Sequence, residues 1–139
     1  MKCLNTRAKL TIQKLYEAMY QKPYMIEEGI YAKIDNNPAY MPVVVEKVGN
    51  LPVYGEIISI AHYGKQNGDA MADPDMEFVI VDGDYYPISY RNDYLCCQQD
   101  VFTLDNEGKP EKINKILQDH LTAFANYWMR NIADQQNLK

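Results

Sequence analysis

The sequence lacks the features that mark secreted, membrane-spanning and zinc-binding proteins. It has three cysteines, of which Cys3 stands alone and Cys96 and Cys97 are adjacent, so no disulfide framework is expected. Nothing in it resembles the CxxC or HxxxH spacings that wrap a zinc ion. The first ten residues, MKCLNTRAKL, hold no apolar signal-peptide core, and no apolar run approaches the length of a membrane span. We therefore expect a cytoplasmic protein with reduced thiols and no membrane partner.

Motifs for nucleotide binding and for acyl transfer are missing as well. The sequence has no Walker loop, no GxGxxG and no GxSxG. Its pI of about 5.0 argues against a broad basic surface, so no direct nucleic-acid partner is expected. Among the aromatic residues, phenylalanine and tryptophan are scarce, with three and one, whereas there are twelve tyrosines. Tyrosine buries its ring while its hydroxyl stays hydrated, which suits half-exposed sheets and interaction surfaces.

Excess charge is absent from most of the chain. The formal net charge is −5, and residues 65–84 carry six acids against one base. The other 119 residues hold thirteen acids and thirteen bases. We call residues 65–84 the acidic segment, because it accounts for the whole imbalance. Its Asn-Gly and Asp-Pro dipeptides are turn formers and predict a loop before the strand that begins at Met76.

The length and the ordinary composition predict a single domain over residues 1–139. An apolar stripe predicts a helix over residues 5–22, with Asn5 as its N-cap. A longer stripe predicts a second helix from Pro110 to about Gln135. Strands are predicted over residues 41–48, 54–63, 76–81, 85–90 and 94–102, and residues 30–34 fit either a strand or a helical turn. The expected fold class is α+β, an antiparallel sheet of four to five strands with both helices on one face.

Side chains alternate between the two faces of a strand, and this assigns the polar residues of the predicted sheet. In residues 54–63, His62 shares a face with Ile60, and Tyr63 lies on the other. In residues 76–81, Glu77 and Phe78 likewise lie on opposite faces.

One interpretation of the acidic segment is a metal site. In an extended chain Asp73, Asp75 and Glu77 project from the same side, and Asp69 and His62 approach from the preceding turn and the neighbouring strand. Carboxylates with one imidazole suit Mg²⁺ or Mn²⁺, which would support a small enzyme acting on phosphoester or nucleotide substrates. The spacing departs from the EF-hand pattern, however, and no nucleophile lies in a known motif, so no catalytic residue is assigned.

The other interpretation is a binding surface without a cofactor. Arg91 is the only base between Lys65 and Lys109 in the sequence, so it either neutralises part of the acidic charge or forms one wall of a polar pocket. A dense run of carboxylates on a rigid domain can also occupy the basic groove of a nucleic-acid enzyme. The candidate surface comprises His62, Tyr63, Asn67, Asp69, Asp73, Asp75, Glu77 and Arg91.

Two strings in the chain resemble a known family. They are AHYGKQNGDAMADPDMEF and, further on, YYPISYRNDYLCCQQDVF. They are similar to the patterns AHYxxQNGDxMxDPxMxF and PISYxxDxxGxxQE of an uncharacterised domain family that phages, plasmids and integrative elements encode. Cys96 stands where the pattern has glycine and Asp100 where it has glutamate, so the first departure leaves the backbone geometry at that position open. The resemblance implies a mobile-element context and no established activity.

Together these observations favour a non-enzymatic accessory protein of a mobile genetic element. We expect it to bind a host or mobile-element protein through the acidic segment and the tyrosine-rich sheet face. Inhibition of a host defence nuclease is one form that such binding could take. The alternative is the divalent-metal enzyme described above.

Overall fold

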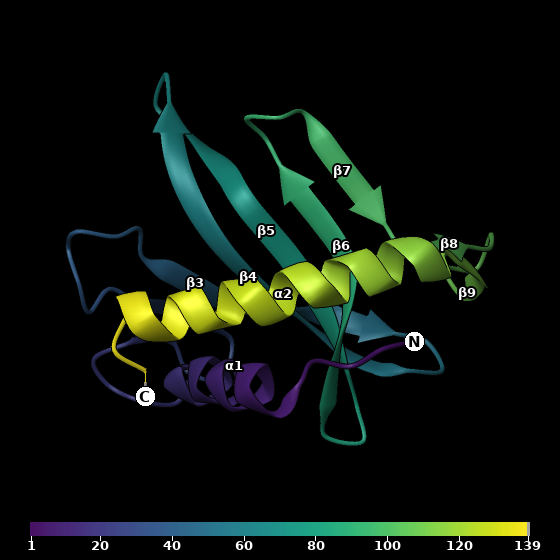
Figure 1. The fold of residues 1–139 in the computed structure, drawn as a ribbon, viewed down its shortest axis with the longest axis horizontal. Coiled ribbons are helices and arrows are strands. Elements are labelled where there is room, and N and C mark those ends of the chain that lie inside the picture. Colours follow the sequence, from purple (N-terminus) through teal and green to yellow (C-terminus); the bar gives the residue numbers. More distant parts are fainter. Residues whose placement is uncertain (139) are drawn as a thin grey trace.

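The computed structural model describes residues 1–138, and within them the chain forms a seven-stranded antiparallel sheet, a two-stranded sheet and two helices (Figure 1). The strands of the larger sheet, which we call the main sheet, lie side by side in sequence order. They are β1 (Met25–Glu27), β2 (Tyr31–Ile34), β3 (Val43–Leu51), β4 (Gly55–Gln66), β5 (Asp69–Val81), β6 (Asp84–Asn92) and β7 (Cys97–Asp100). The smaller sheet pairs β8 (Phe102–Leu104) with β9 (Pro110–Ile113).

The predicted number of four to five strands is wrong, because the main sheet has two short strands that sequence periodicity did not separate. β1 is three residues long, and β2 forms over the segment that fitted either a strand or a helical turn. The predicted strand over residues 94–102 is divided between β7 and β8. Strands of three or four residues are too short for an alternating pattern to stand out, and pairing with neighbours defines them.

The helix predictions are right in kind and differ in their limits. The N-terminal helix α1 spans Thr6–Ala18, and the side-chain oxygen of Asn5 accepts a hydrogen bond from the Ala8 amide, which confirms the predicted N-cap. The C-terminal helix α2 spans Lys115–Gln135 and is capped by Asn114. It does not begin at Pro110, because residues 110–113 pair with β8 as strand β9.

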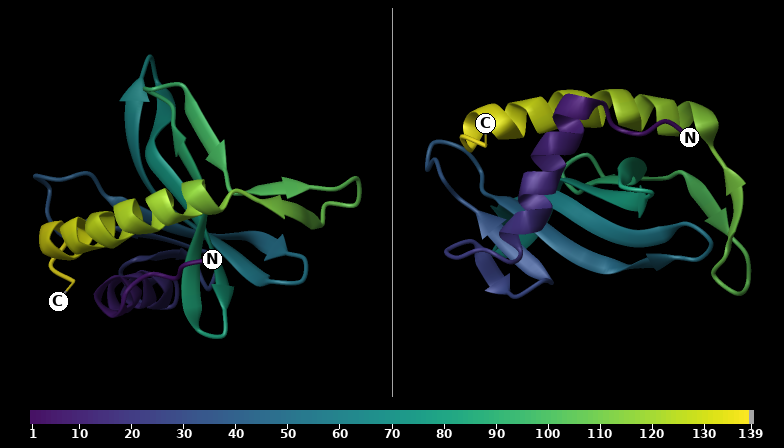
Figure 2. Two further views of the ribbon diagram at one scale, coloured as in Figure 1. Left: turned by 45° about the vertical axis from the view of Figure 1, so that its right-hand side comes forward. Right: turned by 90° about the horizontal axis from the view of Figure 1, so that it is seen from below.

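Both helices pack on the same face of the main sheet (Figure 2). We call this the helix face and the opposite one the open face. The apolar positions of both helices meet alternate residues of the central strands there, because strand side chains alternate while helix side chains recur every three to four positions. The core so formed includes Ile12 and Leu15 of α1, Met129 and Ile132 of α2, and Phe78 of β5.

A smaller apolar cluster lies on the open face. It is formed by Leu51, Val79 and Ile88, against which Tyr54 and Phe102 pack. The rings of Tyr54 and Phe102 have centroids 5.1 Å apart. Phe102 is the first residue of β8, so this contact holds the β8–β9 hairpin against one end of the open face.

Neither helix combines the length and the apolarity that a membrane crossing requires, over the residues that the structure describes.

Candidate functional site

The acidic segment is largely strand, which corrects the predicted loop before Met76. β4 and β5 form a long hairpin joined by Asn67 and Gly68, whose φ angles of 54° and 84° are those of an Asn-Gly turn. Pairing continues from Gln66 and Asp69 down to Ile57 and Val79. The Asn-Gly dipeptide was read correctly as a turn, but the residues after it pair with β4. Asn67 and Asp69 are exposed at the tip of the hairpin.

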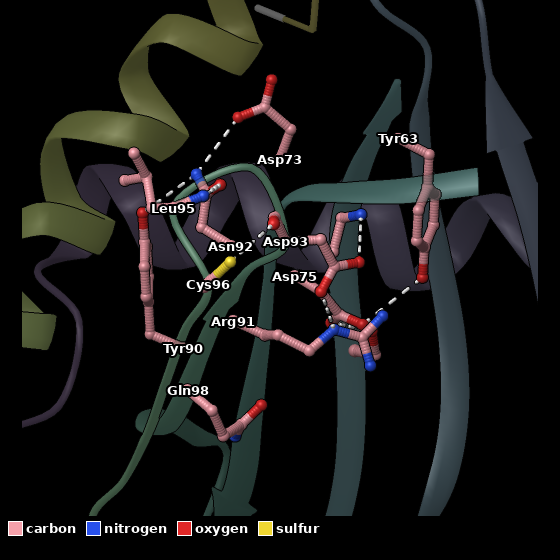
Figure 3. Close-up of polar contacts among 12 residues, drawn as sticks. Tyr63, Asp73, Asp75, Tyr90, Arg91, Asn92, Asp93, Leu95, Cys96 and Gln98 are labelled. Carbon is pink, nitrogen blue, oxygen red and sulfur yellow. Dashed lines mark hydrogen bonds and ion pairs between the residues drawn. The ribbon is translucent and has the colours of Figure 1, made fainter. Parts of the chain in front are cut away.

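A bulge near the middle of this hairpin separates Asp73 from the other acids. Ala61 pairs with Asp75 and Tyr63 pairs with Ala72, so the single residue His62 lies opposite two residues of β5. An extra residue breaks strict alternation. Asp73 therefore does not share a face with Asp75, and Figure 3 shows it apart from Asp75 and beside Asn92.

His62 is buried on the helix face, at 5% exposure. Its ring lies edge-on to Trp128 of α2 with centroids 5.6 Å apart, and its Nδ1 is 3.0 Å from the Pro42 carbonyl oxygen. A carbonyl only accepts, so Nδ1 carries the proton in the neutral ring. Burial lowers the pKa of His62, against the Pro42 carbonyl and the charge of Asp73, which both raise it. The prediction that His62 and Tyr63 point to opposite faces is confirmed.

Asp73 takes part in a network that shapes the end of β6. Its Oδ1 accepts a hydrogen bond of 3.2 Å from the side-chain amide of Asn92, which is itself buried. The Oδ1 atom of Asn92 in turn accepts a hydrogen bond from the Leu95 amide in the turn after β6. These contacts fix the turn, so Asp73 has a structural partner on its own side of the sheet.

Asp75 lies on the open face among hydroxyl donors. Ser59 donates to its Oδ1 at 2.6 Å and Tyr63 donates to its Oδ2 at 3.3 Å. Burial and the nearby charge of Asp75 raise the pKa of Tyr63 to about 12, so its phenol stays protonated and remains a donor. Arg91 is paired with Asp75 across the strands and extends toward Asp75 and Tyr63 (Figure 3).

Glu77 is a carboxylate of the open face whose surroundings disfavour its charge. It is partly buried and accepts a hydrogen bond of 3.2 Å from Ser89. Burial raises its pKa and so do the charges of Asp75 and Asp100, while the Ser89 hydrogen bond and Arg91 lower it. The net shift is upward, which means that ionised Glu77 is held in less favourable surroundings than water would provide.

Arg91 also supports the turn after β6. Its Nε is 3.3 Å from Oδ1 of Asp93, and the other oxygen of Asp93 accepts a hydrogen bond from the Ala72 amide at 2.8 Å. In the same turn Cys96 has φ of 50°, the left-handed conformation that glycine adopts most easily. The chain thus keeps a glycine-type backbone at the position where the resembling pattern has glycine.

Strand register arranges the open face into two rows that run across the strands. From β3 to β7 the first row aligns Glu46, Ser59, Glu77, Ser89 and Asp100. Acids therefore alternate with serines, and successive acids are two strands, or about 10 Å, apart.

The second row aligns Ala61, Asp75, Arg91 and Gln98. Sequence reasoning found Asp75, Glu77 and Arg91 but missed Ser59, Ser89 and Asp100. Those three are recognisable only once the register is known, because their neighbours along the chain are apolar or uncharged.

Two hollows adjoin these rows. The larger, which we call the groove, has a volume of about 660 Å³ and lies between the open face and the β8–β9 hairpin. It is lined by Leu51, Ile57, Glu77, Ile88, Ser89, Asp100, Phe102, Thr103 and Leu104. A small hollow of about 90 Å³ is lined by Asp75, Glu77, Ser89, Arg91 and Gln98. The two hollows share Glu77 and Ser89 in their lining, so they adjoin each other.

The predicted metal ligands do not converge. His62 and Asp73 lie on the helix side, Asp75 and Glu77 on the open face, and Asp69 at the hairpin tip. Within residues 1–138, no group of three or more His, Cys, Asp and Glu side chains is placed to hold a metal ion. What the open face offers chemically is a set of carboxylates and hydroxyls beside apolar walls, which suits recognition of a polar partner.

Comparison with known proteins assigns the chain to a family without assigning an activity. No curated protein and no solved structure matches the chain significantly. A family model described as a domain of unknown function (DUF6908) matches residues 11–138, from within α1 through both sheets and α2. Since the match covers most of the chain, the protein belongs to the DUF6908 family.

Proposed function

We propose that the protein is a non-enzymatic accessory protein of a mobile genetic element and binds a host or mobile-element protein through its open face. The mobile-element context comes from the resemblance of the strings around His62 and Tyr90 to proteins that phages, plasmids and integrative elements encode. Inhibition of a host defence nuclease is one form that the binding takes in this proposal. Such a nuclease has a basic surface that holds phosphates, and a carboxylate-bearing face complements it.

The observation that carries this proposal is the location of the acids. Asp75 and Glu77 lie on the face opposite the helices, beside Tyr63 and Arg91. Glu77 belongs to the row that crosses this face from Glu46 to Asp100, in which acids alternate with serines. Carboxylates gathered on a rigid sheet can pair with a basic partner without the cost of ordering a loop.

The alternative, a divalent-metal enzyme, would require His62, Asp73, Asp75 and Glu77 around one ion. These residues are instead divided between the two sides of the sheet.

The test is affinity capture with matched charge variants. Tagged protein is incubated with lysate of a bacterial host, and bound proteins are identified by mass spectrometry. We expect a partner that the wild type retains and the double variant Asp75→Asn/Glu77→Gln loses. Retention should also fall as salt rises, because screening shortens the range of charge interactions to about 3 Å at 1 M.

The control is Glu27→Gln/Glu28→Gln, which removes the same charge from exposed positions in and after β1, at the far edge of the sheet. It should retain the partner. If no protein distinguishes the open-face variant from this control, the proposed function is wrong.

A further inference from the structure

We propose that the groove binds a basic side chain of the protein partner together with an adjacent apolar side chain. This inference rests on the proposed function, because it names the chemistry of the partner segment that the open face recognises. The groove is lined by residues of β3 to β7 on the main sheet and by β8 of the hairpin on the other side. Its volume of about 660 Å³ falls in the range of roughly 300–1,000 Å³ typical of specific binding sites.

The apolar lining residues of the groove favour an apolar side chain of the partner. Leu51, Ile57, Ile88, Phe102 and Leu104 contribute to its lining. Leu104 is 51% exposed at the rim, although it belongs to a hairpin whose Phe102 is packed inward. An apolar side chain inserted beside Leu104 would remove that surface from water, which is the main favourable contribution in most protein association.

The acidic lining residues of the groove favour a cationic side chain of the partner. Glu77 and Asp100 both line the groove. They lie two strands apart in the same row, with Ser89 between them. Arg91 lines the adjoining small hollow, and its Nε lies 3.3 Å from Oδ1 of Asp93. The groove therefore carries negative charge without a cation among its own lining residues. Burial raises the pKa of Glu77, and the charges of Asp75 and Asp100 add to that rise. A lysine or arginine between Glu77 and Asp100 would offset these effects by favouring the ionised carboxylate.

The other end of the open face does not fit the same ligand. A hollow of about 510 Å³ there is lined by Lys33 and Lys65 as well as Glu46. Its bases outnumber its acid, so a basic partner segment is favoured at the β8–β9 end. This difference gives the bound segment a direction across the sheet.

The experiment titrates ¹⁵N-labelled protein with two short peptides that differ only in the central residue, which is cationic in acetyl-Ile-Arg-Leu-amide and neutral in acetyl-Ile-Gln-Leu-amide. We expect the arginine peptide to shift the backbone amides of Ile88, Ser89 and Phe102 and to bind about tenfold more tightly than the glutamine peptide, as expected for one charge-assisted hydrogen bond. Equal affinities, or shifts confined to other parts of the chain, would overturn the inference.

Two variants separate the contributions of charge and of apolar contact. Glu77→Gln should weaken binding of the arginine peptide about tenfold, and Leu104→Ser should weaken both peptides by a similar factor. Glu28→Gln removes one charge at an exposed position far from the groove and should leave both affinities within about twofold of the wild type. A loss in Glu28→Gln as large as that in Glu77→Gln would show that net charge alone attracts the peptide, which contradicts the inference.

The outcome is distinguishable from failure of the proposed function. If host lysate yields a partner that depends on Asp75 and Glu77 but the peptides do not bind in the groove, only the inference about the groove fails. If the arginine peptide binds as expected and no partner depends on the open face, the groove is supported and the proposed function fails.

Discussion

The two faces of the main sheet are made by the same strands, yet they hold polar residues for opposite reasons. On the helix face, His62 is buried against Trp128 and bonded to the Pro42 carbonyl. On the open face, burial raises the pKa of Glu77, and the charges of Asp75 and Asp100 raise it further. The polar group of the helix face completes the packing. The carboxylate of the open face is in surroundings that disfavour its charge, as is common where a surface is adapted to bind.

This difference shows how few residues separate positions on the two faces of a sheet. His62 and Tyr63 are neighbours in the chain, and so are Glu77 and Phe78, but each pair is divided between the two faces. A one-residue bulge is enough to send Asp73 to the side opposite Asp75. Chain proximity therefore groups the acids wrongly, whereas cross-strand register groups them by face.

The sharpest contrast between the faces is expected in stability. Phe78 is 0% exposed within the helix-face core, so Phe78→Ala should lower the free energy of unfolding by about 3–5 kcal/mol. The adjacent change Glu77→Ala, on the open face, should lower it by less than about 1 kcal/mol. Urea denaturation followed by circular dichroism measures both. Losses of similar size would contradict the division of the sheet into a packed helix face and a solvent-accessible open face.

Much of the fold was predictable because long periodic segments carry a strong signal. The stripes of α1 and α2, the cap at Asn5 and the alternation in β4 all appear in the structure as predicted. The short strand β1 was not predicted, and β7 and β8 were predicted as one strand. Such short strands are defined by pairing with their neighbours and not by a pattern of their own. The prediction of a loop in the acidic segment is wrong in part. Aspartate disfavours strands, but pairing with β4 outweighs that preference.

The candidate site was predictable only in part, for the same reason. Sequence composition drew attention to Asp75 and Glu77, which lie on the open face, and to His62 and Asp73, which do not. Composition gave no means of finding Asp100. This residue lies in the row of Glu77, and four strand pairings connect it to Glu46 at the other end of that row. Local patterns assign a residue to a face, but long-range register decides which residues on that face meet.

A second prediction uses pH to test the helix face. Because burial lowers the pKa of His62, the folded state binds its proton less readily than the unfolded state, whose histidine has a pKa of about 6.5. The stability that neutral His62 contributes is therefore complete above pH 6.5 and is lost as pH falls below it. The slope from this one group cannot exceed about 1.4 kcal/mol per pH unit.

The measurement compares urea unfolding of the wild type and His62→Gln between pH 7.5 and 5.5. The variant should be less stable at pH 7.5, because it loses the packing against Trp128, but its stability should change less with pH. Identical pH dependence in the two proteins would mean that His62 titrates as an exposed histidine, and the assignment to the helix face would fail.

The smallest expected effect has the opposite sign and tests the open face. The folded-state pKa of Glu77 is raised, so the stability that this carboxyl contributes is full below its unfolded pKa and is lost as pH rises through the folded value. At pH 7 Glu77→Gln should therefore raise the free energy of unfolding by a few tenths of a kcal/mol, within the range usual for surface changes. This gain in the free energy of unfolding should disappear in acid, where Glu77 of the wild type is itself protonated. Glu28→Gln, which removes the same charge at an exposed position, is the control and should leave the free energy of unfolding at pH 7 within about 0.5 kcal/mol of the wild type. A variant that folds more stably and binds the arginine peptide more weakly would show that the Glu77 charge costs stability and serves recognition, which is the trade-off expected of a functional surface. A loss of stability in Glu77→Gln at pH 7 would instead make Glu77 a structural residue like those of the helix face.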